Sequence, residues 1–217
     1  MKVIVYVEGP SDKFAMEELL KRLIENKNLQ GLTIEFFPAP IGRNKESLIN
    51  IVPERAANTI LNNPNAIVIA IPDLYPKDKC FQHTTASELI EGLNVRFEES
   101  LSRKGVGDDE RIKQRFKVFC FKYELETLVL AAEQWLKWRL GIDEIAHTWI
   151  IPVEDQDHVN HPKLIVERIF SDNGEKYIDK DDAPAILGKA DYHDIAKKCP
   201  QCFKPFVDFL ENLPNIS

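Results

Sequence analysis

The first two dozen residues constrain the fold of this chain more than any other stretch. The apolar run Val3–Val7 is followed at once by Glu8-Gly9-Pro10 and then by a segment with helical periodicity. A continuous apolar, β-branched run is typical of a strand buried on both faces, as in a parallel sheet. The glycine and proline end that strand, and Ser11 or Asp12 is placed to cap the following helix, whose apolar positions are Met16, Leu19, Leu20, Leu23 and Ile24. The stretch therefore predicts a strand-to-helix unit of an α/β protein.

Two carboxylates lie at the turn of this unit. Glu8 is at the carboxyl end of the predicted strand, and Asp12 follows four residues later. Ligands of open α/β sheets bind at that edge, and two such carboxylates can reach the same hard cation. The alternative is a helix cap and a surface acid favoured by the positive end of the helix. The turn has no Gly-Lys-Ser/Thr, so it is neither a P-loop nor a dinucleotide fingerprint.

The same alternation of strand and helix continues along the chain. Three more strands are expected, separated by helical patterns, at Leu32–Phe37, Ala66–Ile71 and Arg115–Phe121. Helices are expected at Glu46–Leu61, Ala86–Leu101 and from Lys122 to about Leu140. This order predicts an α/β fold with a four-stranded, mostly parallel sheet covered by helices on both faces. The fully apolar third strand is expected to be central.

The character of the sequence changes after Gly141. From Ile142 on, short helical patterns alternate with polar loops. We therefore expect an α/β core over residues 1–141 and a helical extension over residues 142–217 that packs on that core. With 217 residues the chain is long enough for one large domain with such an appendage.

Composition limits the location and the partners of the chain. The sequence enters its first strand directly and has no long apolar run, so we expect a cytoplasmic protein without a signal peptide or a membrane partner. The net charge of −7 disfavours non-specific binding to nucleic-acid phosphates, although basic residues can still cluster locally.

More acids follow the third and fourth predicted strands. Asp73 comes directly after Ala66–Ile71, and Glu124 and Glu126 open the helix after the fourth strand. The carboxyl ends of parallel strands share one edge of a sheet, so these side chains would gather near Glu8. The alternatives are a turn aspartate and ordinary acids of a first helical turn. Convergence at one edge predicts a metal site.

The cysteines and histidines give weaker signals. Cys199 and Cys202 form a CxxC pair, but Cys80 and Cys120 lie on different elements, so small buried residues are favoured over a zinc or redox site. His158 and His161 share a loop with Glu154, Asp155 and Asp157, where a solvated polar loop is favoured over a cation site.

Basic residues cluster around the fourth strand. They are Arg103, Lys104, Arg111, Lys113, Arg115, Lys117 and Lys122. They could meet phosphates, and the alternative is a plain solvated surface.

Four segments together resemble a known family. They are Val-Glu-Gly-Pro-Ser-Asp at 7–12, Ile-Pro-Asp-Leu-Tyr-Pro at 71–76, Tyr-Glu-Leu-Glu-Thr-Leu at 123–128, and a stretch from Pro162-Lys163 through Tyr177 to Cys199-Pro200. In order and spacing they resemble the toprim-like domain-of-unknown-function family 4276, which is related to the toprim domains of overcoming-lysogenization-defect (OLD) nucleases. The resemblance spans nearly the whole chain.

The resemblance implies a role for each matching residue. Glu8 would be the toprim glutamate, a general acid/base or metal ligand, and Lys163 the family's basic catalytic residue. Asp12, Asp73, Glu124 and Glu126 would join Glu8 in holding Mg²⁺ or Mn²⁺, with Glu8, Asp73, Glu126 and Lys163 as the catalytic set. Tyr75 departs from the toprim pattern because it replaces the second Asp of Asp-x-Asp, so Glu126 or Asp78 would have to substitute.

Three hypotheses on function follow. The first is a metal-dependent nuclease acting on DNA or RNA, as the effector of a defence system with an ATPase on a separate subunit, since this chain has no P-loop. The second is a catalytically silent toprim scaffold or regulatory subunit that binds such an ATPase. The third is a small-molecule phosphohydrolase.

Overall fold

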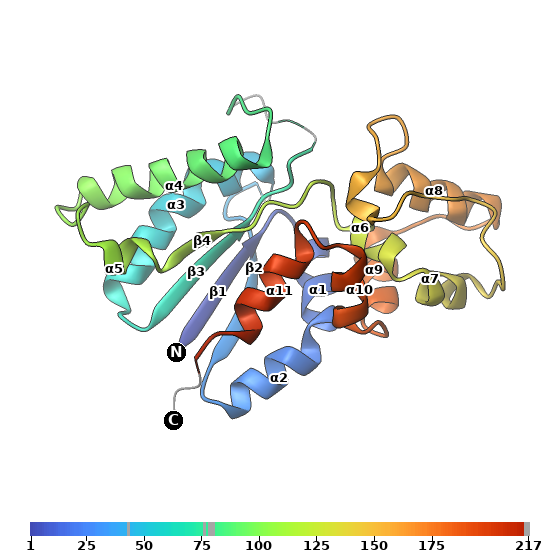
Figure 1. The fold of residues 1–217 in the computed structure, drawn as a ribbon, viewed down its shortest axis with the longest axis horizontal. Helices are drawn as coiled ribbons and strands as arrows, with labels where there is room; N and C mark the ends of the chain where they lie inside the picture. Colours follow the sequence, from blue (N-terminus) through green and yellow to red (C-terminus); the bar gives the residue numbers. More distant parts are fainter. Residues whose placement is uncertain (43, 76, 78–80, 215–217) are drawn as a thin grey trace.

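The sheet has four parallel strands in the order β2-β1-β3-β4 (Figure 1). The computed structural model describes residues 1–42, 44–75, 77 and 81–214. The strands are β1 (Lys2–Val7), β2 (Thr33–Pro38), β3 (Ala66–Ile71) and β4 (Phe116–Val118). All three pairings are parallel, and β1 and β3 are the central pair. The predicted α/β architecture with a central third strand is confirmed.

The register of the central strands sets the edge at which the acids lie. Val7 pairs with Ile71, so the residues after both strands leave the sheet at the same level. β4 is shorter than the expected Arg115–Phe121, yet its backbone stays attached to β3. The Phe121 N–H donates to the Pro72 carbonyl at 3.0 Å, and Asp73 and Phe121 form an isolated parallel bridge. The segment after β4 is thereby held beside Asp73.

One face of the sheet is covered by α3 (Lys45–Asn62) and α4 (Ala86–Ser102). Their buried side chains pack with those of β3 and β4 in one apolar cluster, which includes Leu48, Ile49, Val52, Leu89, Leu93 and Phe97. The short helix α5 (Glu110–Lys113) precedes β4.

The other face is covered by α1 (Pro10–Leu19), α2 (Lys21–Leu29) and α11 (Phe203–Glu211). α2 continues to Leu29, beyond Ile24, the last apolar position expected in the first helical segment. The buried Lys27 holds this part of α2 in place. Its Nζ donates to the carbonyls of Glu211 and Leu213 at 2.7 and 2.9 Å, so the end of α2 is tied to the end of α11. No local sequence pattern predicts that Lys27 contacts residues so far along the chain.

Several helices lie beyond the carboxyl ends of the strands, to the right in Figure 1. They are α6 (Glu126–Ala131), α7 (Glu133–Leu140), α8 (Pro162–Asp172), α9 (Asp179–Leu187) and α10 (Tyr192–Lys198), with a 3-10 turn at Val153–Asp155. The single helix expected up to Leu140 is broken at Ala132, and α7 ends at Gly141, which has a φ of 65°. This left-handed conformation suits glycine at a helix end.

The helices after Gly141 share a core with the first half of the chain. α9 packs against α1, and one apolar cluster joins Ala15, Met16 and Leu19 of α1 to Ala183, Ile186 and Leu187 of α9. The boundary at residue 141 stays a prediction.

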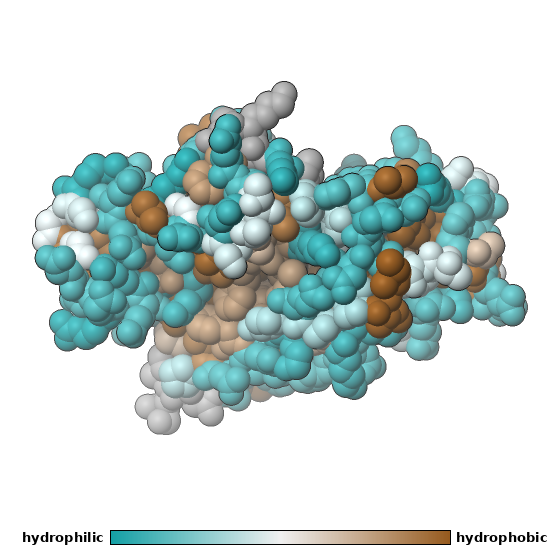
Figure 2. All heavy atoms as spheres, turned by 45° about the horizontal axis from the view of Figure 1, so that its top comes forward, coloured by the Kyte–Doolittle hydropathy of each residue, from teal (hydrophilic) through white to brown (hydrophobic). Residues whose placement is uncertain are grey.

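Hydrophilic residues cover most of the face shown in Figure 2, and apolar residues reach it in limited areas. Among the described residues no helix is long and apolar enough to cross a membrane.

Candidate functional site

The carboxyl edge of the sheet carries a pocket of about 260 Å³ lined mainly by acids. All six residues predicted for the site line it: Glu8, Asp12, Asp73, Glu124, Glu126 and Lys163. They come from the ends of three strands and from α8. Gly9, Ser11, Asn44, Leu125 and Asp179 complete the lining.

Glu8 and Asp73 are joined directly across the two central strands. The Asp73 backbone N–H donates to Glu8 Oε1 at 3.0 Å. This bond follows from the register, since each acid comes one or two residues after the paired ends Val7 and Ile71. The strand ends thus bring together two acids that are 65 residues apart.

Asp12 has a structural role at the start of α1 and also lines the pocket. The N-cap is Gly9, not Ser11 or Asp12 as expected, because Pro10 occupies the first helical position. Asp12 is the third helical residue, and its Oδ2 accepts the Gly9 N–H at 2.7 Å. One carboxylate oxygen is used in this way, so the capping role does not exclude a ligand role for the other.

Glu124 and Glu126 enter from the segment after β4. Glu124 Oε2 is buried and makes no hydrogen bond, and His161 Nδ1 lies 3.8 Å from it. Glu126 is only 2 % exposed, and Lys163 Nζ lies 3.8 Å from its Oε1. Lys163 is also 3.9 Å from Asp179 Oδ2. A buried carboxylate oxygen without a hydrogen bond is costly, so this oxygen would gain from a donor or cation that reaches it.

Burial raises the pKa of four of these acids. The pKa of Glu8 rises to about 7, that of Glu126 to about 7 and that of Asp12 to about 6. The pKa of Asp73 lies well above its usual value, first through burial and then through repulsion by Glu8. Like charges held in a poorly solvated pocket favour protons or a cation between them.

Two charged residues of the site were missed by the sequence analysis. Lys45 is 7 % exposed, its Nζ donates to the Leu74 carbonyl at 3.0 Å, and its charge lowers the pKa of Glu8 and Asp73 against the effect of burial. Asp179 begins α9 and lines the pocket. Neither has a local signal, because Lys45 follows a helix cap and Asp179 looks like an ordinary acid of a first helical turn.

Part of the expected basic cluster is separated from the acids. Arg111, Lys113 and Arg115 precede β4 and so lie at the amino edge of the sheet, opposite the pocket. Lys113 pairs with Glu110 at 2.7 Å, and Arg115 donates to the carbonyls of Asn63 and Pro64. These three residues therefore do not reach the acid pocket, and phosphate binding by the basic cluster stays a prediction. Lys163 and Lys45 are the lysines beside the acids.

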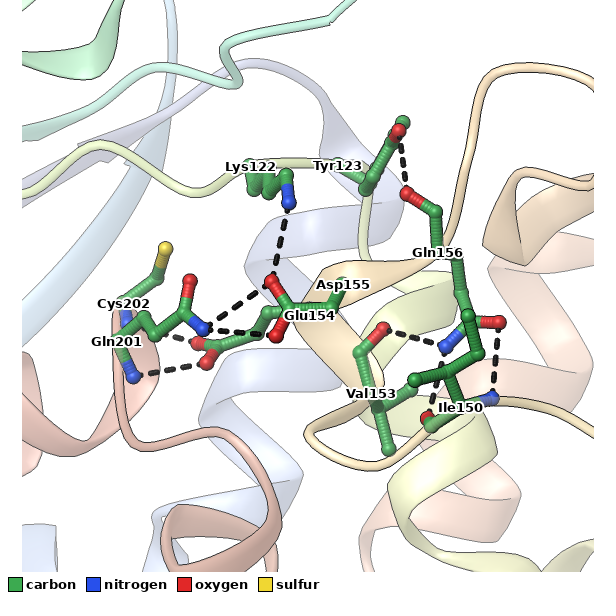
Figure 3. A network of polar contacts seen from close by, with 9 residues as sticks. All are labelled: Lys122, Tyr123, Ile150, Val153, Glu154, Asp155, Gln156, Gln201 and Cys202. Atoms are coloured by element: carbon green, nitrogen blue, oxygen red, sulfur yellow. Dashed lines mark hydrogen bonds and ion pairs between the residues drawn. The ribbon is translucent and has the colours of Figure 1, made fainter.

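The acid-rich loop before α8 is more structural than expected (Figure 3). Glu154 is 1 % exposed, and its carboxylate accepts the backbone N–H groups of Gln201, Cys202 and Phe203 at 2.8, 2.7 and 3.3 Å. It therefore caps the start of α11 instead of pointing into solvent. Cys199 is buried and Cys202 half-buried, both with free thiols.

A divalent cation fits the donor chemistry of the pocket. Carboxylate oxygens are the ligands that Mg²⁺ and Mn²⁺ prefer, and Glu124 Oε2 supplies one that makes no hydrogen bond. Within the described ranges, no three His, Cys, Asp or Glu side chains are close enough together to form a metal site. Tyr75 stands two residues after Asp73, where the toprim pattern has its second acid; Asp78, the other substitute considered, lies outside the described residues.

Comparison with known proteins places the chain in a family. A family model described as "Domain of unknown function (DUF4276)" matches residues 7–211. The chain belongs to the DUF4276 family. This confirms the family resemblance and includes every residue of the acid pocket from Glu8 to Asp179. No curated protein sequence matches the chain.

Solved structures show a weaker similarity to the chain. The C-terminal region of the Burkholderia pseudomallei OLD protein is 14% identical, with a TM-score of 0.47 over 97% of this chain and 96% of that one. The C-terminal region of the Xanthomonas campestris pv. campestris OLD protein is 13% identical, with a TM-score of 0.44 over 97% of this chain and 95% of that one.

Proposed function

We propose that this DUF4276 protein is a phosphodiester hydrolase, a nuclease that depends on Mg²⁺ or Mn²⁺. The observation that carries the proposal is the pocket in which five acids from three strand ends meet one lysine. Resemblance to the toprim pattern at Glu8, Asp12 and Asp73 supports the same reaction class. Glu8, Asp73, Glu124 and Glu126 would hold the cation, with Asp12 beside them.

The chemistry divides between the cation and the chain. When bound, the cation would activate water and neutralise the charge that develops on the phosphate. Glu8 would hold or release a proton at its free oxygen, since its other oxygen is occupied by the Asp73 N–H. Partial burial lowers the local dielectric around these acids and so strengthens the charge interactions within the pocket.

Lys163 would bind the substrate phosphate. Its Nζ lies between the acids of two different elements, 3.8 Å from Glu126 and 3.9 Å from Asp179. Neither contact is a short ion pair, so the ammonium group remains available to a phosphate oxygen. The side chain extends from the first turn of α8, next to Pro162, and this fixes its approach to the pocket.

Calorimetry with Mn²⁺ tests the proposal first. Wild-type protein should bind Mn²⁺ in the micromolar range, and Asp73→Asn should lose that binding while keeping the fold. Asp157→Asn is a matched control, because Asp157 is an exposed acid that accepts backbone N–H groups of its own loop and does not line the acid pocket. Mn²⁺-dependent cleavage of single-stranded DNA or RNA should follow the same pattern. A wild type that binds no Mn²⁺ and cleaves no phosphodiester rejects the proposal.

A second function is favoured by Tyr75. With an aromatic side chain at the position of the second toprim acid, the chain would serve as a silent scaffold or regulatory subunit for a separate ATPase, within a defence system. Calorimetry separates the two proposals, since a scaffold needs no Mn²⁺ bound through Asp73. Cleavage of a small phosphate ester, with no cleavage of nucleic acid, would instead indicate a small-molecule phosphohydrolase.

A further inference from the structure

A second and larger pocket adjoins the acid pocket. Its volume is about 510 Å³, within the range of about 300–1,000 Å³ typical of small-molecule sites. The lining consists of Tyr75, Lys77, Tyr123, Glu124, His158 and His161. Glu124 lines both pockets. A ligand in the larger pocket would therefore reach the acid site through this one side chain.

Three aromatic rings form one wall of the larger pocket. The rings of Tyr75 and Tyr123 have centroids 5.4 Å apart at an angle of 31°. His158 meets Tyr75 edge-on, with centroids 4.1 Å apart and an angle of 85°. Tyr75 is half-buried and His158 exposed, so ring surface remains open to a ligand.

The aromatic wall is held in place by the polar network of Figure 3. Tyr123 is 3 % exposed, and its hydroxyl donates to the Gln156 carbonyl at 2.7 Å. The Gln156 side chain in turn bonds both backbone groups of Ile150, and Lys122 pairs with Asp155 at 3.1 Å. The loop that carries His158 is thus fixed to the segment that carries Tyr123. A wall fixed before binding loses little freedom when a planar ligand stacks on it.

Tyr75 links the wall to the sheet edge. Its backbone N–H donates to the Lys122 carbonyl at 3.3 Å, and the Leu74 N–H donates to the Phe121 carbonyl. The same stretch of backbone therefore places Asp73 in the acid pocket and, two residues later, an aromatic ring in the neighbouring one. The position that lacks a carboxylate supplies a stacking surface instead.

We infer that the larger pocket binds an unpaired nucleobase next to the phosphate that the acid pocket receives. This inference rests on the proposed function and narrows its substrate to single-stranded nucleic acid. Aromatic side chains bind bases by stacking, and only bases outside a duplex offer a free face. Lys77 supplies a cation for the backbone, while His161 offers a polar atom to the edge of the base.

Fluorescence anisotropy with 12-residue, fluorescein-labelled oligonucleotides tests the inference. Binding is measured in CaCl₂ for single-stranded DNA, single-stranded RNA and the matching DNA duplex. The affinities for the two single strands show whether the base comes from DNA or from RNA. Wild-type protein should prefer a single strand to the duplex. Tyr75→Ala should weaken single-strand binding about tenfold, in line with the loss of one stacked base, and Tyr75→Phe should preserve it.

A series of oligonucleotides, each with one base removed at a different position, completes the test. At one position the missing base should weaken wild-type binding as much as Tyr75→Ala does. The same missing base should not weaken the binding of the Tyr75→Ala protein any further. His158→Ala, at an exposed residue, repeats the measurement if Tyr75→Ala unfolds. Equal binding of abasic and normal strands, a preference for the duplex, or no binding by the wild type would each overturn the inference.

The failures of the two proposals are distinguishable. Base-dependent binding without Mn²⁺-dependent cleavage rejects the proposed function and leaves the pocket assignment standing. Cleavage that is indifferent to Tyr75→Ala and to abasic positions rejects the pocket assignment alone.

Discussion

Glu124 differs from its neighbours because one of its oxygens is buried without any hydrogen bond. Glu8 and Asp12 each have an oxygen that accepts a backbone N–H, and Glu126 has Lys163 nearby. An unsatisfied buried oxygen costs about 1–3 kcal/mol, and a charged one costs more. At the residue scale, Glu124 is the side chain with the most to gain from a cation.

Glu124→Gln should therefore separate stability from cation binding. Without metal, the variant should unfold at the same temperature as the wild type or a higher one. Saturating Mn²⁺ should raise the melting temperature of the wild type by roughly 5–10 °C, the effect of a ligand near 100 times its Kd on a chain of this size. The variant should gain less than half of that. An equal gain in both proteins would remove Glu124 from the ligand set.

Lys163 is expected to act on substrate and not on metal. Lys163→Ala should leave Mn²⁺ affinity within about threefold and lower kcat/KM for a single-stranded oligonucleotide by roughly 10- to 100-fold, since one charge-assisted phosphate contact is lost. Lys163→Arg should recover part of the loss. Unchanged cleavage by Lys163→Ala, or equal losses of metal binding and cleavage, would contradict this role.

At the scale of elements, the start of α11 depends on an acid from another part of the chain. Glu154 accepts three N–H groups there, and none of them has an intrahelical partner at that end. Glu154→Ala should lower the free energy of unfolding by about 2–4 kcal/mol, because the carboxylate acceptor is lost while the N–H donors of Cys202 and Phe203 stay partly or wholly buried. Urea denaturation measures the change.

Asp208→Ala is the matched control on the same helix. Asp208 pairs with Lys204 at the surface, where such a pair contributes at most about 1 kcal/mol. A Glu154→Ala protein as stable as this control would show that α11 does not need the cap.

At the scale of the molecule, the predictable part of the site is the part that follows from short sequence patterns. Val3–Val7 and Ala66–Ile71 are continuous apolar runs, so their position as central strands and the acids that follow them could be predicted from the local sequence. Lys45, Asp179 and Glu154 could not, because their roles depend on packing between distant elements. The contact of α9 with α1 brings Asp179 to the pocket, and nothing in either helix specifies the other.

Stability should depend on pH through the same pocket. Glu8, Asp12 and Glu126 have folded-state pKa values of about 7, 6 and 7, above their usual values near 4. At a pH between the unfolded and the folded pKa values, the folded protein binds more protons than the unfolded chain. The free energy of unfolding therefore falls as pH rises from about 5 to 8. The metal-free protein should therefore melt several degrees lower at pH 8 than at pH 5.5, as differential scanning fluorimetry would measure.

Two comparisons assign that pH dependence to the pocket. Self-repulsion in a chain with a net charge of −7 also lowers stability as pH rises. A control must therefore remove the charges of the pocket acids without changing the shape of their side chains. Glu8→Gln/Glu126→Gln mimics the protonated pair, and its melting temperature should vary much less over this range. Mn²⁺ at pH 8 should restore wild-type stability, because a cation replaces the lost protons. A double variant with the wild-type profile would show that the dependence arises outside the pocket.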